Sequence, residues 1–156
     1  MPNVFLPPSE YLPHKAPMII LDEVIDATED TAKAVSYVTE NSVLKTFLND
    51  NGDLPSFYAL ELFSQTVGIW SGYRAKQMNL QIPPMGMVLG GRDISCKASV
   101  IRNGAKIITE VKMIMSDNSI ASFDGTLYVN DEIFARGKVN VISVTHDDLI
   151  KLFKRD

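Results

Sequence analysis

One carboxylate and one amide interrupt the apolar stretch DLPSFYALELFSQTVGIW at residues 53–70. Glu61 and Gln65 are four residues apart, and Gly68 and Gly72 lie within about 60° of them on an α-helix. A buried carboxylate is costly unless it has a partner or a task. Glu61, Gln65, Gly68 and Gly72 thus form a stripe of polar and small residues along the helix, and this stripe has two explanations. Either Glu61 moves a proton or holds a water in a ligand tunnel, or the glycines allow close packing at a subunit seam where Glu61 and Gln65 only make satisfying hydrogen bonds.

The start of the same helix offers a second chemical feature. Pro55 suits a first helical turn, and the backbone N–H groups of Ser56, Phe57 and Tyr58 would then project unpaired from its positive end. These N–H groups could hold a thioester carbonyl, which would acidify the α-carbon or develop an oxyanion. Glu61 would lie within about a turn of the reacting atoms.

The elements that position these residues follow from hydrophobic periodicity. Two strands are expected around a turn at residues 28–30, and a loop at residues 49–53 leads into a helix that runs from residue 55 to about residue 79. Four antiparallel strands in a meander and a short C-terminal helix follow, and Asn103-Gly104 is a two-residue hairpin signal. The expected ranges of the six strands are 18–27, 31–40, 87–101, 106–115, 120–129 and 133–142.

The central helix is apolar around most of its circumference, so it must be covered on nearly all sides. One curved antiparallel sheet covers part of the helix, and a second subunit would cover the rest. This arrangement is an α+β hotdog fold. The sequence thus predicts a single hotdog domain over residues 1–156 that forms a dimer.

The charge and the residue composition exclude several classes of function. The net charge is −4 and the basic residues are scattered, so nucleic acid is not an expected partner. We expect a cytoplasmic protein, since no secretory signal and no membrane span are recognised. The single cysteine, Cys96, is expected to be a buried, inert thiol. His14 and His146 are far apart and no Cys-x-x-Cys occurs, so a metal site has no support.

Two motifs resemble a known family. The segment LPHKAPMIILDEV, which contains His14, resembles the N-terminal segment of (3R)-hydroxyacyl-[acyl-carrier-protein] dehydratases of the FabZ type. LPSFYALELFSQTVG resembles their central-helix motif, in which Pro-Gly precedes a helix bearing Glu-x-x-x-Gln. Pro55, Ser56, Glu61 and Gln65 fall in register with that motif.

The resemblance covers nearly the whole chain. Within this superfamily, the chain looks most like the dehydratase-like hotdog proteins encoded in aryl polyene biosynthesis clusters. The resemblance implies a hotdog dimer that acts on acyl groups carried by acyl carrier protein. The dimer would be a homodimer or a heterodimer with another hotdog protein. The acyl chain would lie in a tunnel at the dimer interface. Phosphopantetheine would carry the substrate, and no other cofactor is implied.

One departure from the family bears on mechanism. The dehydratases carry a catalytic histidine in a Gly-His-Phe-Pro loop, fourteen residues before the helix glutamate, and here that count reaches Phe47. His14 is the remaining candidate for a second acid/base group. The similar histidine of the dehydratases is present in addition to the catalytic one, which implies a structural role. Asp50 and Asp53 are expected to be solvated turn residues, and His146 is expected at the surface of the C-terminal helix.

The segment GMVLGGRD lacks the spacing of a dinucleotide site. Gly90 and Gly91 instead predict a β-bulge, or a place where another backbone or a pantetheine arm passes close. Arg92 is a candidate contact for the acidic groups or the phosphate of a carrier protein.

Three functions remain open from the sequence. The first is dehydration of 3-hydroxyacyl thioesters on acyl carrier protein, in a fatty-acid-like or aryl polyene pathway. In this reading Glu61 is the acid/base and His14 its possible partner. The substrate would contact Ser56, Phe57, Tyr58, Gln65, Gly90, Gly91 and Arg92. The second is a hotdog acyl thioesterase, and the third is a non-catalytic hotdog subunit that pairs with an active dehydratase, which the missing loop histidine favours.

Overall fold

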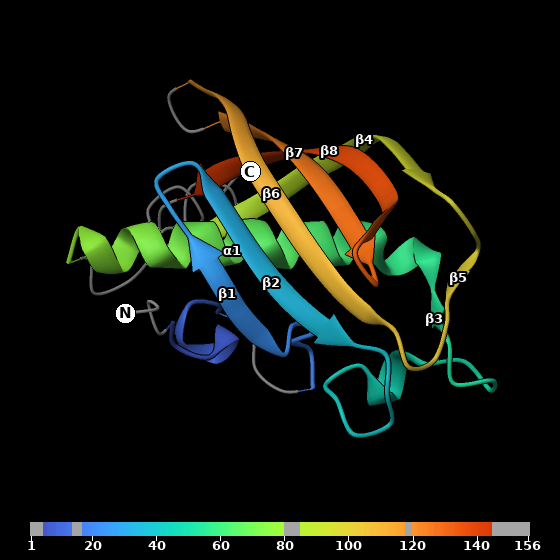
Figure 1. Ribbon diagram of the computed structural model, residues 1–156. Coiled ribbons are helices and arrows are strands. Elements are labelled where there is room, and N and C mark those ends of the chain that lie inside the picture. The colour runs from blue at the N-terminus through green and yellow to red at the C-terminus, as the bar shows by residue number, and fades with distance from the viewer. Residues whose placement is uncertain (1–4, 14–16, 80–84, 118–119, 145–156) are drawn as a thin grey trace, which may run out of the picture.

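A long helix lies in the concave face of a curved antiparallel sheet (Figure 1). The computed structural model describes residues 5–13, 17–79, 85–117 and 120–144. The six-stranded sheet has the order β1-β2-β6-β7-β8-β4, and a two-stranded sheet pairs β3 with β5. The elements are β1 (Glu23–Ala27), β2 (Thr31–Tyr37), β3 (Leu54–Pro55), α1 (Ala59–Gln77), β4 (Met85–Cys96), β5 (Val100–Ile101), β6 (Lys106–Asp117), β7 (Ile120–Val129) and β8 (Glu132–Val144).

The strands β6, β7 and β8 form the predicted meander, and the turn at Asn130 and Asp131 has the two positive φ angles, 49° and 71°, of a tight hairpin. The prediction was wrong for the strand before them. β4 pairs with β8 at the far edge, because both sides of β6 are taken by β2 and β7. Asn103-Gly104 therefore makes a turn, but not a hairpin between neighbouring strands, and β5 before it pairs with β3.

Two predicted boundaries also change. The helix was expected from residue 55, but residues 54–55 form a strand and Ser56–Tyr58 form a 3-10 turn before α1. The first strand was expected from residue 18 and begins at Glu23, because the backbone of Met18 and Ile20 bonds to a helix side chain instead of a strand. The predicted C-terminal helix lies outside the described residues.

The core fills the space between α1 and the concave face of the sheet. Phe63 packs so closely on β7 that a Cβ at Gly125 would lie 2.6 Å from its ring. The Trp70 and Phe123 rings pack in a T-shaped arrangement, with centroids 5.1 Å apart. The largest fully buried side chains include Leu62, Phe63 and Ile69 of the helix and Ile107, Phe123 and Leu127 of the sheet. No helix among the described residues is both long and apolar enough to cross a membrane.

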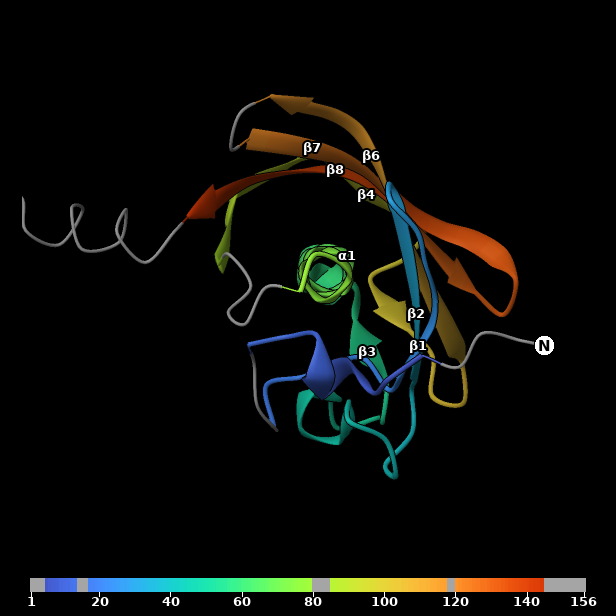
Figure 2. The same cartoon turned by 90° about the vertical axis from the view of Figure 1, so that its left-hand side faces the viewer.

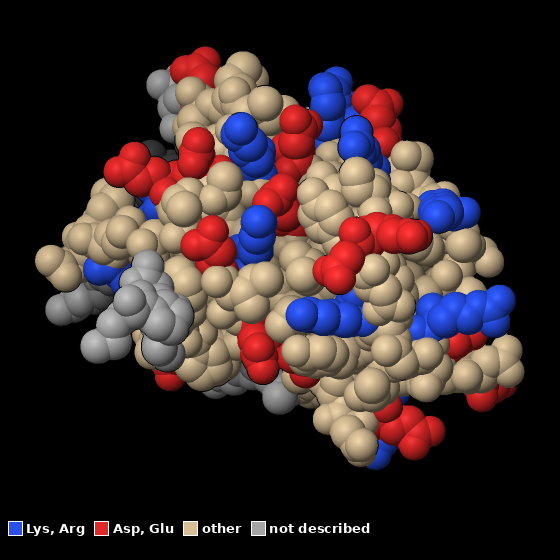
Figure 3. Space-filling model, in the orientation of Figure 1, with Lys and Arg blue, Asp and Glu red and all other residues tan. Residues whose placement is uncertain are grey.

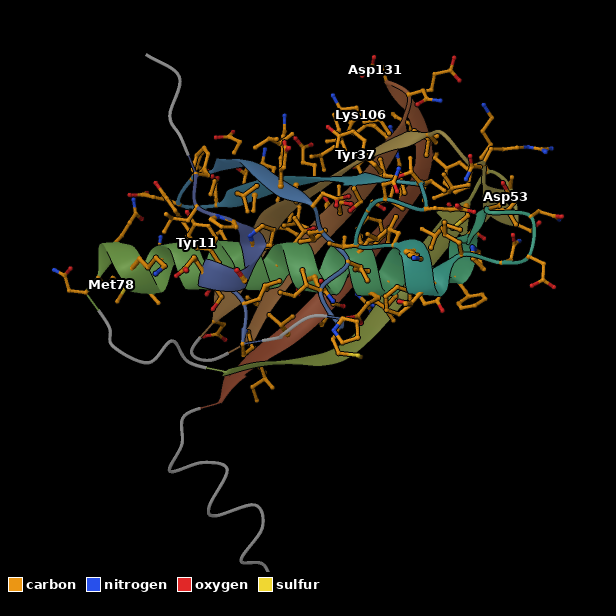
Figure 4. All side chains as sticks on the ribbon, turned by 90° about the horizontal axis from the view of Figure 1, so that it is seen from below. Tyr11, Tyr37, Asp53, Met78, Lys106 and Asp131 are labelled. Carbon is orange, nitrogen blue, oxygen red and sulfur yellow. The ribbon has the colours of Figure 1, made fainter. Side chains whose placement is uncertain are left out.

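The N-terminal segment, residues 5–13 and 17–22, covers a side of α1 that the sheet leaves open (Figure 2). Tyr11 lies against the helix (Figure 4), and its backbone is so close to Gly72 that an added Cβ would overlap it. At Gly68 an added Cβ would lie 2.5 Å from the end of the Leu12 side chain. The two glycines thus serve close packing, as one explanation expected. The partner in that packing is this chain's own N-terminal segment.

Gly72→Ala should destabilise the protein by about 1 to 3 kcal/mol, because the methyl group meets backbone atoms that cannot turn aside. Gly68→Ala is the matched control, since it meets only the flexible end of Leu12 and gains about 1 kcal/mol of helix propensity. Chemical denaturation of both variants measures the difference. Equal stability of the two variants would contradict the proposed close contact at Gly72.

Candidate active site

Glu61 lies in the first turn of α1, and its side chain is exposed on the single chain. One carboxylate oxygen, Oε1, accepts a hydrogen bond of 2.9 Å from Nε2 of Gln65. Phe57 lies four residues before Glu61, and the Met18 carbonyl accepts from the same Gln65 amide; the side chains of these two residues are 74% and 59% exposed. The sequence predicted a dry carboxylate in a tunnel between subunits. On this chain alone the carboxylate faces solvent, so a tunnel around it requires a second subunit.

Gln65 is only 1% exposed, and its amide is satisfied within the chain. Its Oε1 accepts from the Ile20 N–H at 2.9 Å, and its Nε2 donates to the Met18 carbonyl at 2.8 Å and to Glu61. Both amide hydrogens are therefore in use. The predicted direct contact of Gln65 with substrate is not supported by this geometry.

The backbone at the helix start is partly occupied. The Ser56 N–H donates to the Ser99 carbonyl at 2.9 Å, so its predicted role as a free donor was wrong. The Ser56 carbonyl faces the half-buried Cys96, whose Sγ is 3.8 Å away. For the N–H groups of Phe57 and Tyr58 the carbonyl-binding role stays a prediction.

An aromatic cluster of Phe47, Phe57 and Tyr58 surrounds this helix start. The Phe47 ring meets Tyr58 edge-on at 5.4 Å between centroids, and Phe57 lies 4.6 Å from Tyr58. Phe47 is the residue at the family's histidine position by an ungapped count. Its ring has no proton to exchange. His14 lies outside the described residues, so its distance from Glu61 stays open.

The loop before the helix is built by hydrogen bonds of two side chains. Asn49 Oδ1 accepts from the N–H groups of Asn51 and Asp53, each at 3.0 Å. Asp53 was expected to be solvated, but it is only 9% exposed and accepts from the Asn103 N–H at 2.8 Å. Its carboxylate fastens the turn before β6 to the loop. Asp50 is exposed, as expected.

The strand β4 passes close to the helix beside Glu61. The register shifts between Val88 and Gly90, which confirms the predicted bulge. A Cβ at Gly91 would lie 2.6 Å from the side chain of Ile94 and 2.9 Å from that of Leu60, so side chains, and not the predicted second backbone, pass close to it. Contact of either glycine with a pantetheine arm stays a prediction.

Arg92 is exposed, and in the β4–β8 ladder it lies directly opposite Lys138. Its contact with a carrier protein stays a prediction. On the face shown in Figure 3, basic and acidic side chains intermingle. Within the described ranges, no three His, Cys, Asp or Glu side chains gather in a way that could hold a metal ion.

A curved antiparallel sheet wrapped around one long helix defines a hotdog protein. A model of the family described as ApeP-like, ApeP dehydratase, matches residues 6–154. The chain therefore belongs to the ApeP-like dehydratase family.

Curated relatives and solved structures agree with this assignment. The chain is 28% identical to the 3-hydroxyacyl-[acyl-carrier-protein] dehydratase FabZ of Shewanella oneidensis over 134 residues, which cover 83% of this chain and 85% of that protein. The structure of the dehydratase heterocomplex ApeI:P from Xenorhabdus doucetiae matches with a TM-score of 0.90 and 30% identity, over 97% of this chain and 99% of that one.

A hypothetical thioesterase of Streptococcus pneumoniae, solved with coenzyme A, matches with a TM-score of 0.59 at 11% identity, over 79% and 85% of the two chains. That likeness shows the fold alone. The predicted family and fold are confirmed, and the comparisons support the predicted dehydration of 3-hydroxyacyl thioesters in a fatty-acid-like or aryl polyene pathway.

Proposed function

We propose that this chain takes part in the dehydration of 3-hydroxyacyl groups on acyl carrier protein, with Glu61 as an acid/base group. The observation that carries the proposal is the arrangement of Glu61. One of its oxygens is held by a buried amide, and it lies in the first turn of the central helix near exposed apolar side chains. Relatives of the chain are dehydratases of this type.

The reaction breaks the C2–H bond of the acyl chain, and its electrons form the C2=C3 double bond. The C3–O bond breaks, and the hydroxyl takes up a proton and leaves as water. Glu61 can move one of these two protons. A thioester carbonyl near the Phe57 and Tyr58 N–H groups would be stabilised as charge develops on its oxygen. Only proton transfers are needed, so phosphopantetheine is the one prosthetic group that we propose.

A second acid/base group is needed, and Phe47 cannot supply it. The similar ApeI:P structure is a dehydratase heterocomplex. We therefore propose that a second hotdog subunit covers Phe57 and Met18 and encloses Glu61. His14 stays the candidate for the second acid/base group on this chain, and a histidine of the second subunit is the alternative that the heterocomplex favours. A cytoplasmic location stays a prediction.

The absent loop histidine also favours a second function, that of a subunit which shapes the tunnel of an active partner without doing chemistry. Phe47 and its packing on Tyr58 are the observations that favour it. The thioesterase alternative has only the shared fold in its support.

The docking of the carrier protein would involve the outer face of β4 and β8. Arg92 and Lys138 are directly opposite each other there, and Arg136 lies two residues further along β8, opposite Ser95. Like charges directly opposite destabilise a sheet. Among the described residues, none of these three cations has an ion pair within 4.0 Å, although Lys138 also lies opposite Asp124 of β7, which leaves Arg92 and Arg136 without an acidic residue directly opposite. An acidic carrier surface or a phosphate would compensate this charge.

Incubation with a 3-hydroxyacyl carrier protein should yield the enoyl thioester, detected by mass spectrometry as loss of water. Glu61→Gln should lower turnover by about a hundredfold or more, because one proton transfer is lost. Glu40→Gln, at another exposed glutamate, is the control. Unchanged turnover in Glu61→Gln would remove the proposed role, and release of free acid would identify a thioesterase.

The chain should purify from its native source with a second hotdog subunit that carries a Gly-His-Phe-Pro loop, and turnover should require both chains. Phe57→Asp should weaken the assembly, because it places a charge in the covered apolar surface. Val43→Asp, at an exposed loop position, should leave it intact. Native mass spectrometry measures both. Full turnover by this chain alone would contradict the need for a partner.

Arg92→Glu together with Arg136→Glu should weaken binding of the carrier protein by about tenfold or more at low salt and reduce its salt dependence. Lys112→Glu is the control, since Lys112 lies on the same sheet but opposite Asp124. Titration with an acylated carrier protein measures the affinities. Equal losses in the control and the double variant would place the docking surface elsewhere.

A further inference from the structure

The side-chain amide of Gln65 makes hydrogen bonds with three partners, and two of them, a backbone N–H and a backbone carbonyl, cannot exchange the roles of donor and acceptor. A backbone N–H only donates and a backbone carbonyl only accepts, so the bonds to Ile20 and Met18 fix which end of the amide is oxygen and which is nitrogen. The remaining amide hydrogen can then point only at Glu61. The orientation of the amide is therefore determined by the N-terminal segment.

That segment is itself anchored to the sheet. The Ser36 hydroxyl on β2 donates to the Ile20 carbonyl at 2.7 Å, and the Asp22 N–H donates to the Val35 carbonyl at 2.8 Å. The Asp22 carboxylate accepts from the Tyr37 N–H at 2.8 Å. A continuous series of bonds thus connects β2, residues 18–22, Gln65 and Glu61.

From this geometry we propose that Gln65 is a positioning residue that decides which oxygen of Glu61 reacts. The amide holds Oε1, which leaves Oε2 as the oxygen that exchanges a proton with the substrate. The inference rests on the proposed function of Glu61. It assigns Gln65 to orientation of the carboxylate rather than to contact with the acyl chain.

If Gln65 only orients the carboxylate, its loss should lower kcat but leave KM nearly unchanged. Loss of the amide frees the carboxylate to rotate and displaces the reactive oxygen from the substrate, which lowers kcat. Because Gln65 does not touch the substrate, KM should stay within about twofold.

Gln65→Met removes the three hydrogen bonds at nearly constant volume, and Thr66→Val is its matched control. Thr66 is the next residue, equally buried, and its hydroxyl donates to the Leu62 carbonyl at 2.7 Å without a contact to Glu61. Both variants are assayed in the assembly in which the chain is active, alone and combined with Glu61→Gln. We expect Gln65→Met to lower kcat about ten- to a hundredfold in the wild-type background and to have no further effect beside Glu61→Gln.

An equal loss of kcat in both backgrounds, or the same loss in Thr66→Val, would overturn the inference and leave the role of Glu61 standing. If Glu61→Gln alone has no effect on turnover, the proposed function fails together with the inference.

Gln65→Glu is a second variant for the case that Gln65→Met does not fold. It places a second carboxyl group against Glu61, and the two should titrate as a pair. The pH profile of kcat should then change shape, whereas Thr66→Val should keep the wild-type profile. An unchanged profile in Gln65→Glu would contradict the inference.

Discussion

The buried amide of Gln65 is the contact on which the arrangement of the site depends. A mostly apolar helix needs cover on the side that the sheet does not reach, and the N-terminal segment provides it. Residues 18–20 precede the first strand, so the Ile20 N–H and the Met18 carbonyl have no strand partner beneath the helix. The amide supplies a donor and an acceptor to that backbone. Packing of the helix and orientation of Glu61 are therefore consequences of the same side chain.

The stripe of polar and small residues on α1 has two functions along its length. Its C-terminal half, Gly68 and Gly72, allows close approach of residues 11 and 12. Its N-terminal half leaves Glu61 exposed near Phe57 and Met18. The packing explanation and the functional explanation of the stripe are thus compatible. The similar ApeI:P structure is a dehydratase heterocomplex, and the proposed second subunit would cover the exposed half in the same manner.

The sequence pattern correctly predicted those features of the fold that depend on interactions between residues close in sequence. The central helix, the period-2 strands β6 to β8 and the bulge at Gly90 follow from residues that are close in sequence. The errors arose where a distant partner decides. β4 pairs with β8 because that edge was free, the first strand starts late because its early backbone binds a residue 45 positions away, and Asp53 is buried by Asn103, 50 positions away. The use of the Ser56 N–H by Ser99 has the same cause.

The decisive measurement is a structure of the active assembly with an unreactive 3-hydroxyacyl analogue attached to the carrier protein. We expect Oε1 of Glu61 to remain on the Gln65 amide, and Oε2 to lie about 2.6 to 3.2 Å from the C3 hydroxyl or within reach of C2. The acyl chain should pass between Glu61 and the second subunit. An acyl chain bound away from Glu61, or a Glu61 carboxylate detached from Gln65 in the complex, would contradict the account.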